Sequence, residues 1–407
     1  MRQKVLICLL SDQPIPNLLS IHAIRPDFLC LLVTERMRKA KAAKHLLKAL
    51  EEGDLYYAGP TKVFEEPIPE PDSIEATRAA LTSVEEKFRG AEWHINVTGG
   101  TKPMAFAAFE WGREKQAHVF YYEVSKPGLM RDLCGAGNHS PSPARKLSCL
   151  EFLKAYGHDI KPSSANHAEL AEWFFPWAKA LAREPQHINL RALTGSGENN
   201  EPLFRSGLLK GAFEEEVKRR QGAKLPDGLG SLVKLEGTRR RYILDKPTLV
   251  FLQGAWLEYL LYCLLKKHQG NLGIWDLRLK TAFGTDANDQ GNELDLMFMM
   301  NYALCGVECK TGTMSSDKSF DAMLKLEAVM AQWRALLRRT WFVTSSDTVY
   351  DPDSETKPRA LRPVVERRSR VYGCRVVAPH EIKALAAAQD DSKELELLQE
   401  IFAPAGN

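Results

Sequence analysis

The chain has 407 residues, more than one ordinary hydrophobic core supports, so we expect two or three domains. A hydrophobic content of 44% excludes a disordered protein, and a net charge of +3 means that affinity for nucleic acid must come from local basic clusters. The short apolar run from Val5 to Leu10 is too brief for a secretory signal, and no apolar run reaches membrane-spanning length. Eight cysteines without Cys-x-x-Cys spacing indicate reduced core thiols in a cytoplasmic protein, and no zinc site.

Strands and helices alternate in the first domain, which we place at residues 1–135. The expected strands cover 5–10, 28–33, 55–58, 93–97 and 118–124, and the expected helices cover 17–24, 35–52, 73–88 and 102–115. Such alternation predicts a parallel sheet with right-handed crossovers, hence a Rossmann-like α/β domain. Ligands of these sheets bind beyond the carboxyl ends of the strands, where the strand order reverses.

Two loops lie at that position, after the first and the fourth expected strands. The second reads Thr-Gly-Gly-Thr-Lys from Thr98 to Lys102, and the helix that begins there directs amide groups toward an anion. It predicts a phosphate-binding loop, although a tight turn with a capping threonine has the same pattern. Neither loop contains a Walker A or a dinucleotide-binding motif.

A loop-like stretch at 128–145 ends this domain, and residues 145–245 are expected to form a small helical or winged-helix connector. Helical periodicity covers 149–156, 167–181 and 213–220. Three consecutive arginines at 239–241 either contact phosphates or belong to a solvated surface.

The stretch Glu293–Lys310 dominates the last domain, residues 246–407. Folded as a hairpin that turns at residues 301–302, it places Asp295 opposite Glu308. Side chains alternate along a strand, so one face is polar and the other packs on a core. The expected core face carries Leu294, Leu296, Phe298, Met300, Ala303, Cys305, Val307 and Cys309.

The polar face gathers Glu293, Asp295, Glu308 and Lys310 at one end of the hairpin. Two neighbouring carboxylates repel each other unless a proton or a cation lies between them, so a Mg²⁺ or Mn²⁺ site is the simplest interpretation. Ordinary salt bridges on a surface hairpin are the alternative.

The order Asp, then Glu-x-Lys across a strand-turn-strand resembles the defining motif of the PD-(D/E)xK restriction-endonuclease-like superfamily. The resemblance implies that Asp295, Glu308 and the Cys309 carbonyl hold the metal, while Lys310 acts on the attacking water. Glu258 lies in an apolar helix before the hairpin, where the superfamily often places a further acidic residue, and a solvent-facing position is its alternative.

A Rossmann-like domain with Thr-Gly-Gly-Thr-Lys, joined to such a nuclease motif, resembles the CRISPR-associated Rossmann fold (CARF) ancillary nucleases. The resemblance implies a homodimer activated by a cyclic oligoadenylate, with cyclic tetra-adenylate expected first, that cuts single-stranded RNA or DNA in type III CRISPR antiviral defence. It also implies that the two loops of the first domain bind the activator across the dimer interface. By position, the ligand-binding residues would be Ser11, Asp12, Gln13, Pro14, Asn17, Thr98, Gly99, Gly100, Thr101, Lys102 and Met104. A repair or restriction nuclease without an activator, or a ligand-controlled DNA-binding regulator, remains the alternative.

Overall fold

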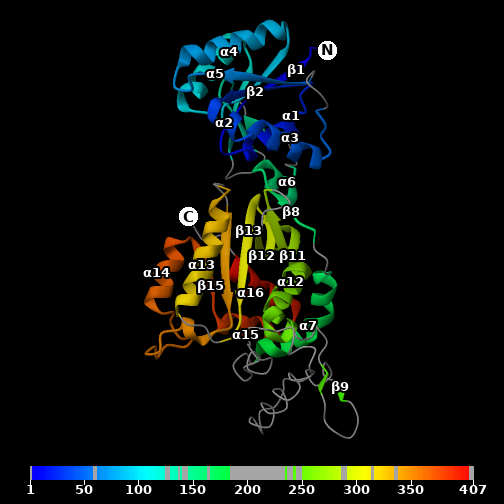
Figure 1. Ribbon diagram of the computed structural model, residues 1–407, viewed down its shortest axis with the longest axis vertical. Helices are drawn as coiled ribbons and strands as arrows, with labels where there is room; N and C mark the ends of the chain where they lie inside the picture. Colours follow the sequence, from blue (N-terminus) through cyan, green and yellow to red (C-terminus); the bar gives the residue numbers. More distant parts are fainter. Residues whose placement is uncertain are drawn as a thin grey trace.

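The computed structural model describes residues 2–57, 62–123, 129–135, 138–139, 145–162, 166–183, 234–235, 242–243, 250–285, 291–312, 316–333 and 338–402. Two α/β domains, each with its own sheet, are stacked along the long axis of the molecule, with helix α6 between them (Figure 1). The expected succession of a Rossmann-like domain and a second α/β domain is confirmed.

The N-terminal sheet has seven strands in the order β3-β2-β1-β4-β5-β6-β7. Strands β1 to β5 pair in parallel, whereas β6 and β7 are antiparallel additions at one edge. The order reverses between β1 and β4, where the two candidate loops begin. The elements are β1 Lys4–Leu9, α1 Ile15–Ile24, β2 Phe28–Thr34, α2 Glu35–Lys39, α3 Ala42–Glu52, β3 Val63–Ile68, α4 Ile74–Lys87, β4 Glu92–Asn96, α5 Lys102–Glu114, β5 His118–Glu123, β6 Leu129–Asp132 and β7 Asn138–His139.

The third strand differs from the prediction. Strand β3 occupies Val63–Ile68, whereas residues 55–57 of the predicted strand are not extended in a ladder and residue 58 lies outside the described residues. The sequence Val-Phe-Glu-Glu-Pro-Ile lacks a continuous apolar run because β3 is an edge strand that pairs only with β2. Part of the predicted loop at 128–145 is likewise paired, as β6 and β7.

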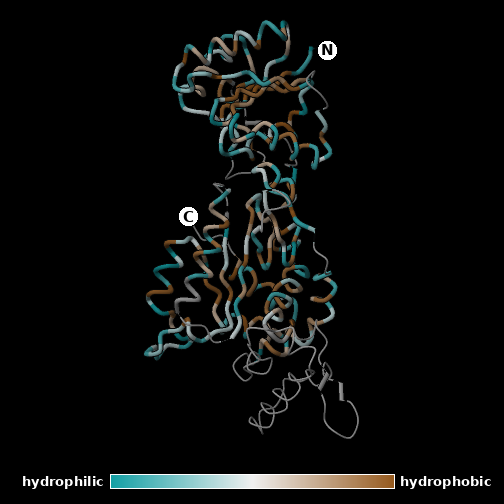
Figure 2. Tube along the Cα trace, in the orientation of Figure 1, coloured by the Kyte–Doolittle hydropathy of each residue, from teal (hydrophilic) through white to brown (hydrophobic). Residues whose placement is uncertain are grey.

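Helices cover both faces of this sheet, and hydrophobic residues concentrate along its central strands (Figure 2). Helices α4 and α5 cover one face, and α1 and α3 cover the face directed toward the C-terminal domain (Figure 1). The parallel strands are therefore buried on both sides, which explains their unbroken apolar sequences.

The C-terminal sheet has six strands in the order β15-β14-β13-β12-β11-β8. Its faces pack against α13 and α14 on one side and against α7, α12, α15 and α16 on the other. The elements are β8 Asp159–Ile160, α7 His167–Arg183, a π-helical turn Phe251–Ala255, α12 Trp256–His268, β11 Ile274–Gly284, β12 Asn292–Met300, β13 Ala303–Lys310, α13 Ser316–Ala331, β14 Arg338–Thr344, a 3-10 turn Asp347–Val349, α14 Pro363–Val371, β15 Cys374–Val377, α15 Pro379–Ala387 and α16 Asp391–Phe402.

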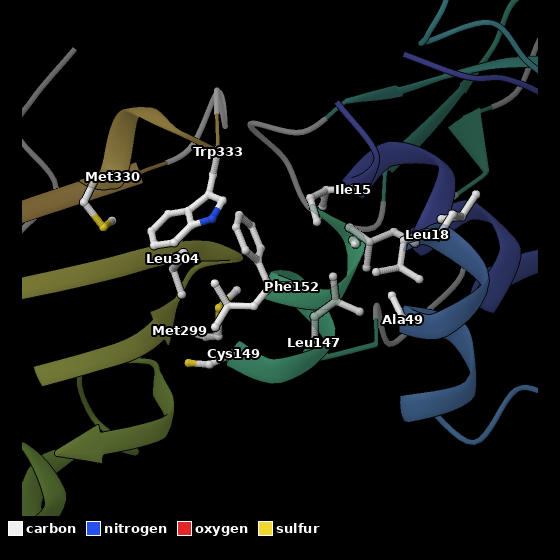
Figure 3. Packing of buried hydrophobic residues seen from close by; sticks show 14 of the residues in the cluster. Ile15, Leu18, Ala49, Leu147, Cys149, Phe152, Met299, Leu304, Met330 and Trp333 are labelled. Carbon is white, nitrogen blue, oxygen red and sulfur yellow. The ribbon is translucent and has the colours of Figure 1, made fainter. Parts of the chain in front are cut away.

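Helix α6, Cys149–Ala155, joins the two domains. It packs on α3, and its buried side chains belong to one hydrophobic cluster with residues of both domains. Figure 3 shows Phe152 between Ile15 and Leu18 of the N-terminal domain and Met299 and Trp333 of the C-terminal domain. The two domains therefore share a continuous core through this helix.

The described part of residues 145–245 does not stand apart as a unit. After α6 the chain adds β8 to the C-terminal sheet, and α7 packs against α12. A short hairpin pairs β9 Lys234–Leu235 with β10 Tyr242–Ile243. The predicted helix at 213–220 and the arginines at 239–241 lie outside the described residues.

All eight cysteines are free, and six of them are buried. The burial of these six agrees with the prediction of core thiols. None of the described helices combines the length and the hydropathy that crossing a membrane requires.

Candidate functional site

The predicted hairpin forms with the predicted register. Strands β12 and β13 pair from Met300↔Ala303 to Leu296↔Val307, so the paired residue numbers sum to 603 throughout. Asn301 and Tyr302 both have positive φ, at 50° and 63°, as the two central residues of a type I′ turn require. The turn therefore fixes the register that brings Asp295 and Glu308 to the same end of the hairpin.

The ladder ends before it reaches the acidic pair. The Cys309 amide donates a hydrogen bond of 2.7 Å to Asp295 Oδ2, so the aspartate is bonded to the neighbouring backbone where a ladder pair was predicted. Leu294 packs in the hydrophobic cluster on the opposite side of the sheet from Leu296, which corrects its predicted place. The alternation of side chains between the two faces of strand β12 is thus interrupted at Asp295.

Glu258 is brought to this site by helix α12. The backbone of Gly254 has φ of 150°, and a Cβ there would lie 2.6 Å from Thr311 Oγ1, next to the end of β13. Glycine thus allows the start of the helix to approach the end of the hairpin. Glu258 is buried, which excludes the alternative of a solvent-facing position.

Three carboxylates meet here out of contact with bulk water: Glu258, Asp295 and Glu308 are each at most 9% exposed. Burial, followed by the charge of Asp295, raises the pKa of Glu258 to about 7. The same two causes, in the same order, raise the pKa of Glu308. The carboxylates therefore repel one another within one site, as the sequence predicted.

Each glutamate is paired with a lysine. Lys310 Nζ forms a close ion pair with Glu308 Oε1, and Lys280 Nζ lies 2.6 Å from Glu258 Oε2. Burial lowers the pKa of each lysine, but the surrounding carboxylates outweigh it and the pKa of both is raised. The sequence interpretation missed Lys280, which lies on β11. Glu293 is exposed and near Lys280.

The donor set fits a hard divalent cation, which prefers carboxylate and carbonyl oxygens. Among the residues that the structure describes, no three His, Cys, Asp or Glu side chains are arranged to hold one metal ion as they stand. The predicted ligand set differs from such a group, because it consists of two side chains, Asp295 and Glu308, and one backbone carbonyl, that of Cys309. A cation bound between the two buried carboxylates would relieve the repulsion that raises the pKa of Glu308.

In the N-terminal domain, the loops after β1 and β4 meet, as predicted. A Cβ at Gly99 would lie 2.2 Å from the Leu9 carbonyl oxygen and 3.2 Å from Ser11 Oγ, so only glycine permits this approach. Thr101 caps α5 by accepting a hydrogen bond from the Met104 amide. Lys102 follows as an exposed cation at the positive end of the helix.

Two predicted ligand residues turn their side chains into the core. Asn17 is 1% exposed, and its amide group is engaged with the Leu9 carbonyl and with Asn96. Met104 is fully buried. The hydroxyl of Thr98 is similarly occupied, because it donates to Asn96 Oδ1 and accepts from the Tyr122 amide. These residues shape the loops. The buried side chains of Asn17 and Met104 are not exposed to a ligand.

The remaining loop residues are at least partly accessible, and the structure adds two neighbours to them. Arg36 Nη1 forms an ion pair of 2.8 Å with Asp12 Oδ2 and is 69% exposed. The Tyr156 hydroxyl, at the end of α6, lies 3.5 Å from Gln13 Oε1. Arg36 lies in the predicted helix at 35–52 and Tyr156 in the one at 149–156, and neither was among the predicted ligand residues.

Two family descriptions match the chain, one over each domain. Residues 5–151 match the Card1 CARF domain, and residues 245–388 match the Card1-like endonuclease domain. The chain contains a Card1 CARF domain and a Card1-like endonuclease domain. The second family description indicates that the C-terminal domain is that of a nuclease, which the acidic hairpin had suggested.

Several solved structures are similar in fold to this chain over both of its domains. Can2 from Sulfobacillus thermosulfidooxidans, in complex with cyclic tetra-adenylate, aligns with 98% of this chain and 100% of its own at 18% identity and a TM-score of 0.67. Protein VC1899 from Vibrio cholerae aligns over 99% of both chains, at 18% identity and a TM-score of 0.72. A type III CRISPR defence DNA nuclease activated by cyclic oligoadenylate covers 91% of this chain and 52% of its own, at 17% identity and a TM-score of 0.51. No curated protein matches the chain.

Proposed function

We propose that this protein is a metal-dependent endonuclease that a cyclic oligoadenylate activates and that cleaves single-stranded RNA or DNA in type III CRISPR antiviral defence. One observation carries the proposal: a single chain joins a CARF domain to an endonuclease domain whose hairpin gathers Asp295, Glu308 and Lys310. The likeness in fold to Can2 with its cyclic tetra-adenylate supports this ring as the first activator to test.

The activator binds, in this proposal, at the loops after β1 and β4. Lys102, the amides at the start of α5 and the glycine backbone at 99–100 offer positive potential and close approach to phosphodiesters. Arg36 adds a further exposed cation on the same edge of the sheet. A ring with even symmetry suits a two-fold dimer axis, with each subunit binding half of the ring, and this supports a homodimer.

In the endonuclease domain, Asp295, Glu308 and the Cys309 carbonyl would hold Mn²⁺ or Mg²⁺. Such a cation supplies Lewis acidity to the scissile phosphate and lowers the pKa of a bound water. Lys310 lies beside Glu308, where its ammonium can orient the attacking water and stabilise the charge that develops on the phosphate. Glu258 completes the acidic set from α12.

The signal crosses between the domains through α6. Tyr156 contacts Gln13 in the first activator loop, and one turn earlier Phe152 is buried in the hydrophobic cluster shared with the endonuclease domain (Figure 3). A displacement of the loop on activator binding is therefore transmitted to packed side chains, which have few alternative arrangements. The cluster includes Met299 and Leu304 of the catalytic hairpin.

The test is cleavage of labelled single-stranded RNA and DNA by the purified protein, followed on a gel. We expect cutting only when Mn²⁺ and a cyclic oligoadenylate are both present, and no cutting by Glu308→Gln. Equal cutting without the activator would indicate a repair or restriction nuclease. Binding of a defined duplex without any cutting would indicate a regulator.

A further inference from the structure

Lys280 has an unusual backbone for its place in the sheet. On β11 its neighbours pair as Leu279↔Leu296 and Thr281↔Leu294, so Lys280 lies across from Asp295. Its φ of 48° is left-handed, which is uncommon for a non-glycine residue and strains the backbone. Strain of this kind persists where the surroundings hold the residue in place, and it is concentrated at functional sites.

The side chain of Lys280 is partly buried and brings its ammonium to the acidic site. Lys280 Nζ lies 2.6 Å from Glu258 Oε2, with side chains only 18% and 11% exposed. The charges of Asp295 and Glu293 also act on it. On the other side of Asp295, Lys310 pairs with Glu308 in the same way. Two lysine–glutamate pairs thus flank one aspartate.

We propose that Lys280 is a positioning residue, which acts through Glu258 on the metal site of the endonuclease domain. Its ion pair holds one oxygen of Glu258 and would thereby fix the carboxylate in place beside Asp295 when a cation binds. A partner that orients a ligand in this way typically changes metal affinity about 10- to 100-fold when it is removed. The inference rests on the proposed function, because it assumes that the site binds a divalent cation.

The test measures Mn²⁺ affinity by calorimetry in the full-length protein, without substrate. Lys280→Met should weaken binding about 10- to 100-fold, and Lys280→Arg should recover part of it, because it keeps the charge. In the Glu258→Gln background, Lys280→Met should cause no further loss, since the group through which it acts is already gone. Lys266→Met is the matched control, because it removes a 2.5 Å lysine–glutamate pair between α12 and α7 that is about half exposed. It should bind Mn²⁺ as the wild type does.

Unchanged affinity in Lys280→Met, or an equal loss in the Glu258→Gln background, would overturn the inference. If Lys280→Met does not fold, Lys280→Arg is compared in the wild-type and the Glu258→Gln backgrounds instead. A loss of Mn²⁺ affinity in the wild-type background that disappears in the Glu258→Gln background supports the positioning role, whereas no loss, or an equal loss in both backgrounds, contradicts it. A wild-type protein that binds no Mn²⁺ would instead contradict the proposed function.

Discussion

Glu258→Gln should make the metal-free protein more stable at alkaline pH. The pKa of Glu258 is raised from 4.5 to about 7, so between these values the folded protein keeps a proton that the unfolded chain has lost. The free energy of unfolding therefore falls as pH rises from 4.5 to 7 and remains lower above that range. This difference in pKa corresponds to a loss of about 3 kcal/mol in the free energy of unfolding. Glutamine resembles the protonated acid and does not ionise, so the mutant should not show this loss.

The assay is urea unfolding in EDTA at several pH values from 5 to 9. The mutant and the wild type should be nearly equal at pH 5 and differ by up to about 3 kcal/mol at pH 9. Adding Mn²⁺ should stabilise the wild type more than the mutant, because ligation offsets the repulsion. Glu172→Gln, at the exposed pair with Lys266, should show no such pH dependence. A mutant that is less stable than the wild type at pH 9 would show that Glu258 does not destabilise the fold when it is ionised.

Four further substitutions test separate parts of the account. Glu308→Gln should lower the rate of cleavage by several orders of magnitude while leaving activator binding unchanged in calorimetry; weaker activator binding would count against separate sites. Lys102→Ala should weaken activator binding and leave Mn²⁺ affinity as in the wild type, and a changed Mn²⁺ affinity would contradict it. Phe152→Leu should lower the free energy of unfolding by roughly 1 kcal/mol. It should also weaken activation, so the cleavage rate with activator divided by the rate without it should fall. Burial raises the pKa of Glu394, but hydrogen bonds from lysines and a histidine outweigh burial and lower the pKa to about 2. In urea unfolding, Glu394→Gln should therefore lower the free energy of unfolding by about 3 kcal/mol near pH 7 and by little near pH 2.

The parts of the fold with a strong local signal could be predicted from the sequence. The turn at 301–302 and its register followed from residue spacing alone, because alternation permits only one pairing that buries the apolar face. The buried strands β1 and β2 were equally clear from their apolar runs. Strand β3 was misplaced because its pairing with β2, and not its own composition, makes it a strand.

The site was predicted only where a motif marked it. Asp295 and Glu308 were found by their spacing, but Lys280 stands in an ordinary Arg-Leu-Lys-Thr sequence, and its left-handed backbone is set by tertiary contacts. Asn17 was taken for a ligand because it follows a loop at the expected edge of the sheet. Its burial depends on Asn96, which is 79 residues away, and no local pattern reveals that contact.

Control of the endonuclease domain by ligand bound to the CARF domain is measured by titrating cyclic tetra-adenylate at fixed Mn²⁺, with binding and the initial rate of single-strand cleavage followed in the same buffer. We expect a saturable rise in rate from a low basal level, with its midpoint at the dissociation constant of the activator. A rate that is already maximal without the activator, or that stays at the basal level when the ligand is fully bound, would show that the two domains are not coupled.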